Sequence, residues 1–270
     1  MTSRIDQVFN TARRDGRKVL IPYIMAGDPD LAATAELVRA LEAAGADAIE
    51  LGIPFSDPIA DGPVILRAAM RALTHGTSLT QVLDTVRALR AHTQVPIVFM
   101  SYYNPIYVYG DARFARDAVA AGVDGVIVPD LPPEEAHGLV QAAREHGLAT
   151  IFLLAPTSNP ARINKVCRQA TGFIYYVSLT GITGARLTDF GDVAQRVKAI
   201  RARTTKPVAV GFGISNAEQA KAAAQAADGV IVGSALVRVI EERIDAGASR
   251  AQLVGAARDF TAALRKGLDG

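Results

Sequence analysis

The chain has 270 residues, 50% of them hydrophobic, and its 29 basic and 27 acidic residues give a formal net charge of +2. That balance excludes the strong positive field with which proteins attract nucleic acids or anionic membranes. The single cysteine, Cys167, excludes a disulfide within the chain and a metal cluster built on cysteines. The first residues lack the apolar core of a signal peptide and no apolar run is long enough to span a membrane, so we expect a soluble cytoplasmic protein.

An amphipathic helix is predicted at residues 3–14, where Ile5, Val8 and Phe9 recur at helical spacing. After it, nearly continuous apolar runs alternate with helical patterns, and such runs are typical of parallel strands buried on both faces. The predicted strands are residues 18–25, 46–52, 95–101, 124–128, 148–155, 172–178, 207–211 and 228–232. The predicted helices are residues 28–44, 64–73, 78–91, 111–121 and 192–203, with others starting at 132, 159, 215 and 235.

Short polar motifs indicate where several of these helices start. Asp28 is predicted as an N-cap, with Pro29 in the first helical turn. Residues 78–81 and 215–218 match the capping box, in which a serine and a polar residue three positions later satisfy free backbone groups. Residues 132–135, Pro-Pro-Glu-Glu, are predicted to open a further helix.

A strand followed by a helix, repeated about eight times over about 250 residues, is the signature of a (β/α)8 barrel. Residues 44–49, 121–126 and 226–230 repeat one pattern, in which a helix stop is followed by an aspartate and a buried strand. The alternative, a doubly wound open sheet, lacks its glycine fingerprint after the first strand, where residues 25–28 are Met-Ala-Gly-Asp. No low-complexity linker divides the chain, so we expect one TIM barrel domain over residues 1–270, with an extra N-terminal helix.

Two carboxylates stand out around the second predicted strand. Glu50 lies within an apolar strand, where a charged carboxylate is costly unless it is paired. Either an arginine or lysine elsewhere pairs with it, or burial raises its pKa so that it donates a proton near neutral pH. Asp61 ends the proline-rich loop that follows, and before a glycine it is either a turn former or a second reacting group.

Other candidates lie at or near the ends of predicted strands three, four and six, where barrels place their reacting groups. These are Tyr102, Asp130 and Tyr175. The alternative for Tyr175 is a core aromatic with its hydroxyl satisfied, and the alternative for Asp130 is a turn or cap residue. From the residues alone, we favour these alternatives for both. The sequence shows no metal site, serine nucleophile elbow or P-loop. The four histidines fall on predicted helices or helix ends and are expected at the surface: His75, His92, His137 and His146.

Glycines follow the last two predicted strands. Residues 211–215, Gly-Phe-Gly-Ile-Ser, join strand seven to a helix, and Gly233 and Ser234 follow strand eight. Two helix N-termini with bare backbone suit a phosphate, which accepts hydrogen bonds from free N–H groups. The alternative is that these glycines only permit tight turns. Residues 181–184, Gly-Ile-Thr-Gly, fit a lid that closes over a ligand.

Residues 102–109, Tyr-Tyr-Asn-Pro-Ile-Tyr-Val-Tyr, are unusually apolar and aromatic for the loop that we expect there. Exposed surface of this kind is rare on a free monomer, and tyrosine is enriched at interfaces. We therefore predict that this segment docks a protein partner together with Ile53, Pro54 and Phe55. The alternative is that the loop packs on itself.

Residues 50–58 (Glu-Leu-Gly-Ile-Pro-Phe-Ser-Asp-Pro), 60–63, 181–184, 211–214 and 233–234 carry a resemblance to the tryptophan synthase α chain family that spans nearly the whole chain. The resemblance implies a (β/α)8 lyase that cleaves indole-3-glycerol phosphate to indole and D-glyceraldehyde 3-phosphate in L-tryptophan biosynthesis. It also implies an α2β2 complex, in which indole passes through a tunnel to a β chain that holds pyridoxal phosphate, whereas the α chain holds no cofactor.

The resemblance assigns proton transfer to Glu50, the indole N–H contact to Asp61, and the positioning of substrate or of Glu50 to Tyr175. It assigns substrate binding to Tyr23, Met100, Tyr102, Thr183, Gly184, Phe212, Gly213, Gly233 and Ser234, and partner docking to residues 53–58 and 102–109. Of these, Tyr23, Met100 and Tyr102 would line the indole pocket, and Gly184, Gly213, Gly233 and Ser234 would hold the phosphate.

Two positions depart from the family pattern. Leu179 stands in the lid loop where well-known relatives carry arginine, and Pro129 precedes Asp130 where some relatives have a smaller residue. The alternative functions are another phosphosugar barrel, which would share the glycines but not explain Asp61, and a non-catalytic regulatory subunit, against which the intact Glu50 and Asp61 argue.

Overall fold

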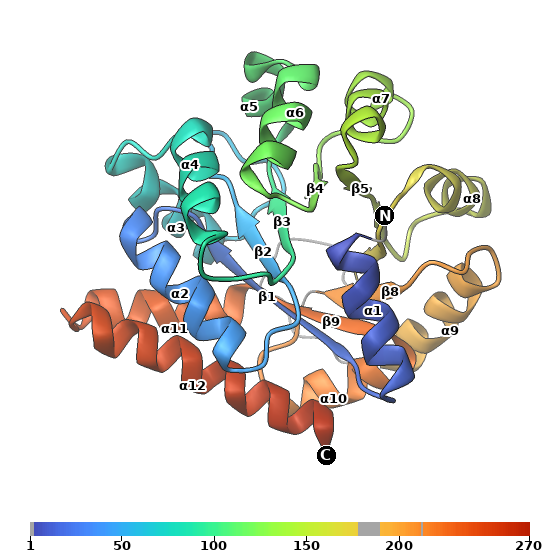
Figure 1. The fold of residues 1–270 in the computed structure, drawn as a ribbon. Helices are drawn as coiled ribbons and strands as arrows, with labels where there is room; N and C mark the ends of the chain where they lie inside the picture. The colour runs from blue at the N-terminus through green and yellow to red at the C-terminus, as the bar shows by residue number, and fades with distance from the viewer. Residues whose placement is uncertain (1–2, 178–189, 212) are drawn as a thin grey trace.

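The computed structural model describes residues 3–177, 190–211 and 213–270, which form a barrel of parallel strands surrounded by helices (Figure 1). Nine strands among these residues follow the order β5-β4-β3-β2-β1-β9-β8-β7-β6. Their bounds are β1 Val19–Met25, β2 Ile49–Gly52, β3 Ile97–Met100, β4 Gly125–Ile127, β5 Ala149–Ile151, β6 Leu153–Leu154, β7 Ile174–Val177, β8 Val208–Gly211 and β9 Gly229–Val232. Only Phe152 separates β5 from β6, so these are two parts of one strand that pairs with β4 and with β7 and closes the ring. The predicted (β/α)8 barrel is confirmed.

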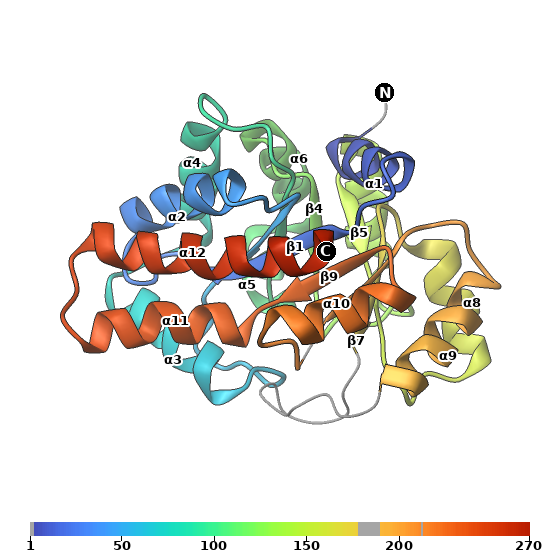
Figure 2. The same cartoon turned by 90° about the horizontal axis from the view of Figure 1, so that it is seen from below.

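Helices cover the outside of the barrel, and α12, the longest of the described helices, lies beside α2 and α11 (Figure 2). The helix bounds are α1 Arg4–Arg14, α2 Leu31–Ala43, α3 Pro63–Thr74, α4 Leu79–Leu89, α5 Tyr103–Tyr109, α6 Asp111–Ala121, α7 His137–His146, α8 Pro160–Gln169, α9 Phe190–Arg201, α10 Ala217–Ala226, α11 Ser234–Asp245 and α12 Arg250–Asp269. Among the described helices, none combines the length and the apolar composition needed to cross a bilayer.

Alternation along each strand divides the side chains between two cores. In β2, Ile49 and Leu51 join the large cluster that packs between the strands and the helices. Ala48, just before β2, joins the smaller cluster inside the barrel, with Val98 of β3. Because successive side chains of a strand point to opposite faces, Glu50 faces the barrel interior.

Helix α1 closes one end of the barrel, as its predicted amphipathic face requires. Ile5, Phe9 and Ala12 are buried in the interior cluster, and the rings of Phe9 and Phe173 lie 5.5 Å apart. Phe173 immediately precedes β7, so α1 covers the amino ends of the strands and leaves the carboxyl ends for chemistry.

Several predicted helix starts are corrected. The N-cap of α2 is Asp30, whose side chain accepts a hydrogen bond from the Ala33 N–H; Asp28 instead pairs with Arg71. Helix α10 is capped by Asn216 rather than by Ser215, because Ser215 donates its N–H and hydroxyl to the Gln219 side chain. The capping box at Ser78 is confirmed.

Two other predicted segments differ from the structure. Residues 132–135 form a turn, in which the Pro132 carbonyl accepts from the Glu135 and Ala136 N–H groups, and α7 begins only at His137. Residues 103–109 form the short helix α5 rather than a loop, because Pro105 falls in its first turn, where no backbone donor is needed.

Candidate active site

Glu50 is buried inside the barrel, with 2% of its surface exposed. Its neighbours in register are Tyr23 on β1 and Val98 on β3. Within the part of the chain that the structure describes, its Oε2 atom has no hydrogen-bond partner and the side chain forms no ion pair. Burial above all, and then the charge of Asp61, raise the pKa of Glu50 to about 8. Of the two readings of Glu50, the structure favours the protonated acid over the structural ion pair.

Asp61 lies in the loop between β2 and α3, close enough to Glu50 for their charges to interact. Burial raises the pKa of Asp61 to about 6, and a hydrogen bond from the Tyr102 side chain lowers it in part. The Tyr102 hydroxyl also accepts a hydrogen bond from the Ala60 N–H at 3.0 Å. Tyr102, which follows β3, thus ties down the end of the loop that carries Asp61.

Two further tyrosines surround the carboxylates. Tyr23 is buried against α3, and its pKa is raised well above the usual value by burial and then by the charges of Asp61 and Glu50. Tyr175 is buried in the interior cluster, and its pKa is raised by burial and then by the charge of Glu50. Met100 packs against both of these interior clusters. The structure therefore brings together the residues predicted for proton transfer and for the indole pocket.

Glycines leave the space that the two interior tyrosines occupy. A Cβ atom at Gly52 would lie 2.2 Å from the Tyr23 hydroxyl oxygen and 2.8 Å from its Cζ atom. A Cβ atom at Gly211 would lie 2.5 Å from the Tyr175 hydroxyl oxygen. These contacts are shorter than packed atoms allow, so a larger residue at either position displaces a tyrosine.

We expect Gly52→Ala to destabilise the fold by about 1–3 kcal/mol, because the added methyl group overpacks the site. Tyr23→Phe removes the oxygen atom that the methyl group meets, so the same substitution costs less in that background. Urea unfolding of the four proteins in this cycle measures the difference. Gly255→Ala is the control, since a Cβ there meets nothing within 4 Å inside α12, and an equal cost of Gly52→Ala in both backgrounds would contradict the contact.

The predicted phosphate site is only partly described. Gly233 is the N-cap of α11 and has no side chain that could cap it. The backbone N–H groups in the first turn, beginning with that of Ser234, therefore have no side-chain acceptor at the N-cap. Gly213 has φ +77°, a conformation that favours glycine. The prediction of two bare helix N-termini is wrong for α10, because Asn216 caps it. The predicted positions Leu179, Thr183, Gly184 and Phe212 lie outside the described residues.

Asp130, another candidate from the sequence, has a structural role. Asp130 accepts a hydrogen bond from the Tyr103 N–H at 2.9 Å and so caps α5, as the turn or cap interpretation expects. Among the described residues, no group of three or more His, Cys, Asp or Glu side chains is placed to hold a metal ion. All four histidines are exposed, as expected: His75, His92, His137 and His146.

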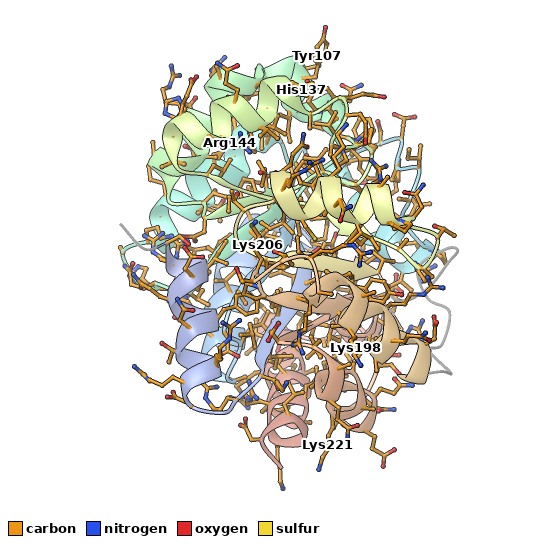
Figure 3. The ribbon with its side chains drawn as sticks, turned by 90° about the vertical axis from the view of Figure 1, so that its right-hand side faces the viewer. Tyr107, His137, Arg144, Lys198, Lys206 and Lys221 are labelled. Carbon is orange, nitrogen blue, oxygen red and sulfur yellow. The ribbon has the colours of Figure 1, made fainter. Side chains whose placement is uncertain are left out.

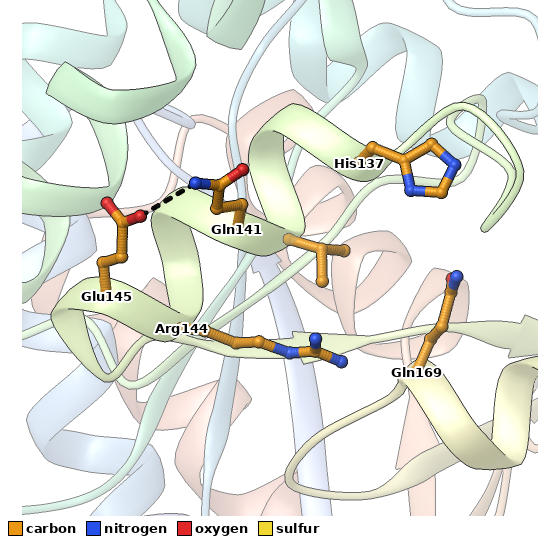
Figure 4. A pocket seen from close by; sticks show the side chains of 6 residues that line it. His137, Gln141, Arg144, Glu145 and Gln169 are labelled. Carbon is orange, nitrogen blue, oxygen red and sulfur yellow. Dashed lines mark hydrogen bonds between the residues drawn. The ribbon is translucent and has the colours of Figure 1, made fainter.

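A hollow of about 390 Å³ lies on the outside of the barrel, between α7 and α8 (Figure 4). Arg144 and His137 point toward it, and Gln141 donates a hydrogen bond to Glu145 at 3.1 Å on its rim. Neither Glu50 nor Asp61 lines this hollow. It is therefore separate from the candidate active site inside the barrel.

Sequence reasoning missed an ion-pair cluster beside the site, formed by Asp28, Arg67, Arg71 and Glu241. Arg67 and Arg71 are spaced i,i+4 on α3, and this spacing was the available signal. Their acceptors lie far away in sequence, so no local pattern could identify them.

The chain matches the family model described as tryptophan synthase alpha chain over residues 9–265. It is 53% identical to the tryptophan synthase alpha chain of Geobacter sulfurreducens over 266 residues, covering 98% of this chain and 99% of that one. The corresponding protein of Thioalkalivibrio sulfidiphilus is 51% identical over 99% of this chain and 100% of its own length.

Solved structures agree in fold and sequence. Tryptophan synthase subunit alpha from Legionella pneumophila superposes with a TM-score of 0.92 at 40% identity, covering 100% of this chain and 99% of that one. A chain of Mycobacterium tuberculosis tryptophan synthase superposes with a TM-score of 0.90 at 40% identity, covering 99% of each. The motif around Glu50, the barrel and these likenesses agree, and the chain belongs to the tryptophan synthase alpha chain family.

Proposed function

We propose that Glu50 and Asp61 divide the work of this family's reaction, in which the chain acts as a carbon–carbon lyase on indole-3-glycerol phosphate in tryptophan biosynthesis. One observation carries the assignment: a buried carboxyl, which forms no ion pair with any described residue and has its pKa raised to about 8, lies within charge interaction of a carboxyl whose pKa is about 6. At pH 7 the first holds its proton and the second is mostly ionised. The site therefore offers an acid and an anion side by side.

The reaction can use one carboxyl group twice, first as an acid and then as a base. Glu50 donates its proton to C3 of the indole ring, and the positive charge that develops at N1 is stabilised by the Asp61 carboxylate. The Glu50 carboxylate then accepts the proton of the glycerol hydroxyl next to the ring. The O–H electrons form the aldehyde C=O, and the electrons of the breaking C–C bond restore the indole ring. Indole and glyceraldehyde 3-phosphate leave, and Glu50 is protonated again.

The substrate contacts follow from the same arrangement. The buried Tyr23 and Tyr102 and the partly buried Met100 provide apolar surface near the carboxylates for the indole ring. The uncapped start of α11 suits the phosphate group. The remaining assignments are Tyr175 as a positioning residue beside Glu50, and Thr183, Gly184, Phe212, Gly213, Gly233 and Ser234 as binding residues.

The chain is further proposed to act in the cytoplasm as one barrel domain that binds a tryptophan synthase β chain in an α2β2 complex. On α5, 69% of Tyr107 and 79% of Val108 are exposed, although both are large and apolar. This agrees with a docking surface at residues 102–109, now a helix, with residues 53–58 beside it, since the Phe55 and Tyr102 rings lie 5.6 Å apart. The pyridoxal phosphate of such a complex belongs to the β chain.

We expect Tyr107→Asp to weaken binding of the β chain by at least about tenfold, because it places a charge in an apolar interface. The melting temperature of the chain alone should hardly change, since Tyr107 is exposed. Titration with a purified β chain by calorimetry measures the loss. Lys221→Glu is the control, because Lys221 is exposed on α10, at the opposite end of the molecule from Tyr107 (Figure 3). Unchanged affinity of the Tyr107→Asp variant would contradict the docking surface.

The direct test of the function is release of indole from indole-3-glycerol phosphate by the purified chain, with and without the β chain. Indole formation by the chain supports a catalytic subunit. Absence of indole in both mixtures would favour one of the alternatives, a different phosphosugar enzyme or a regulatory subunit that only activates its partner.

A further inference from the structure

Four charged side chains connect three elements next to the candidate active site. Arg71 on α3 donates two hydrogen bonds to Asp28, at 2.8 and 2.9 Å, and one to Glu241 at 2.7 Å. Asp28 lies in the turn after β1 and Glu241 on α11. Arg67, one turn earlier on α3, donates two hydrogen bonds to Glu241 at 2.8 and 2.7 Å.

The two carboxylates of this cluster are unusual in being buried. The exposed fraction is 2% for Asp28 and 7% for Glu241, and a buried carboxylate of this kind requires a partner that satisfies it. Hydrogen bonds from Arg67 and, to a smaller extent, from Arg71 lower the pKa of Glu241. Burial raises the pKa of Asp28, and the hydrogen bonds from Arg71 offset part of that rise. Two donors of the Arg71 guanidinium bind both oxygens of Asp28, and such a fork fixes direction as well as distance. Arg71 therefore defines where α3 lies against the turn after β1, and its third hydrogen bond connects the same point to α11.

Apolar packing alone defines that position poorly. The buried face of α3 consists of Val64, Ile65, Ala68, Ala69 and Ala72. Alanine side chains form shallow ridges, which resist sliding of one helix along another less than large side chains do. The directional contacts of Arg71 therefore set the position of α3 along its axis.

The position of α3 matters because Asp61 lies only two residues before its first residue, Pro63. The loop from Asp61 to Pro63 is short, so a shift of the helix moves the carboxylate. Tyr102 holds the loop from one side through Ala60, and α3 holds it from the other. Misplacement of a reacting group by about 1 Å is enough to cost about 100-fold in rate.

We propose that Arg71, held by Asp28 and Glu241, is a positioning residue for Asp61. This inference rests on the proposed function, because it assigns Arg71 a role only through the part that Asp61 plays in catalysis. Arg71 does not itself touch the substrate in this arrangement, since it lies on the far end of α3 from Asp61.

We expect Arg71→Met to lower kcat for indole formation by about 10- to 100-fold while KM changes less than about threefold. Arg71→Lys keeps the charge but loses the fork, so it restores kcat only in part. Arg67→Met is the matched control on the same helix. The Arg67 side chain is 54% exposed, against 23% for Arg71, and its replacement leaves the contact between Arg71 and Asp28 intact. Its kcat should stay within about threefold of the unaltered chain.

The decisive readout is a double-mutant cycle with Asp61→Asn. If Arg71 acts through Asp61, Arg71→Met lowers kcat much less in the Asp61→Asn background than in the unaltered chain. Equal losses in the two backgrounds would overturn the inference and leave the proposed function standing. If Asp61→Asn alone left kcat unchanged, the proposed role of Asp61 would fall, and the inference with it.

A second variant tests the proposal even if Arg71→Met fails to fold. Arg71→Met leaves Asp28 buried and unpaired, whereas Asp28→Asn combined with Arg71→Met removes both charges. The double variant should fold and show the same loss of kcat, because neither new side chain can fix the helix position. Normal kcat in the folded double variant would overturn the inference.

Discussion

Replacing Glu50 with glutamine is expected to lower kcat for indole formation by about 1,000-fold. Glutamine matches the size of glutamate but cannot donate an acidic proton, so the variant loses general acid catalysis, which is worth about 10²–10⁴-fold. Glu50 is buried inside the barrel, where burial keeps its proton in place near neutral pH. Steady-state assays at several pH values measure the loss.

Binding separates this loss from a collapse of the site. The affinity for glyceraldehyde 3-phosphate should stay within about threefold, because the phosphate contacts proposed at Gly233 and Ser234 lie at the start of α11 rather than on β2. If Glu50→Gln kept most of its activity, the assigned acid would be wrong. If affinity fell together with kcat, the substitution would have damaged the whole site.

The same variant also changes how stability depends on pH. The pKa of Glu50 rises from 4.5 to about 8 on folding, so the native state binds more protons than the unfolded state between those values. The free energy of unfolding therefore falls as pH rises through that window, and is lowest above pH 8. Glu50→Gln removes this contribution, so its melting temperature should fall less between pH 5 and pH 9 than that of the unaltered chain.

The sequence predicted the part of this site that regular patterns determine. The apolar run around Glu50 and the loop to Asp61 could be placed from strand periodicity, and the capping box at Ser78 from local spacing. Asp28 shows the limit of such reasoning. Its capping role was predicted from Pro29 next to it, but its actual partner, Arg71, lies 43 residues away.

The helix α5 shows a second limit. Residues 102–109 were expected to form a loop, because seven residues give too little periodicity to indicate a helix, and proline is tolerated in the first helical turn. A raised pKa of Glu50 could be proposed as one of two alternatives but not chosen, since its burial, and the absence of a cationic partner among the described residues, depend on strands far apart in sequence. Local sequence patterns do not show which distant elements of a chain come into contact.

Asp61→Asn is expected to lower kcat by about 100-fold, because the positive charge that develops at the indole nitrogen loses its anionic partner. The unaltered chain should show a bell-shaped dependence of kcat/KM on pH, with limbs near the pKa values of Asp61, about 6, and Glu50, about 8. Asp84→Asn is the control, because it removes the same charge from an exposed position on α4.

The position of the basic limb in the Asp61→Asn variant gives the sharpest result. The charge of Asp61 helps to keep the proton on Glu50, so its removal lowers the pKa of Glu50 and moves the basic limb to lower pH. The limb stays above the ordinary pKa of a glutamate, because burial, the larger cause, is unchanged. The acidic limb near pH 6 disappears with the group that produced it. A basic limb that stayed at pH 8 would mean that the two carboxyls do not interact, and the division of roles between Glu50 and Asp61 would have to be abandoned.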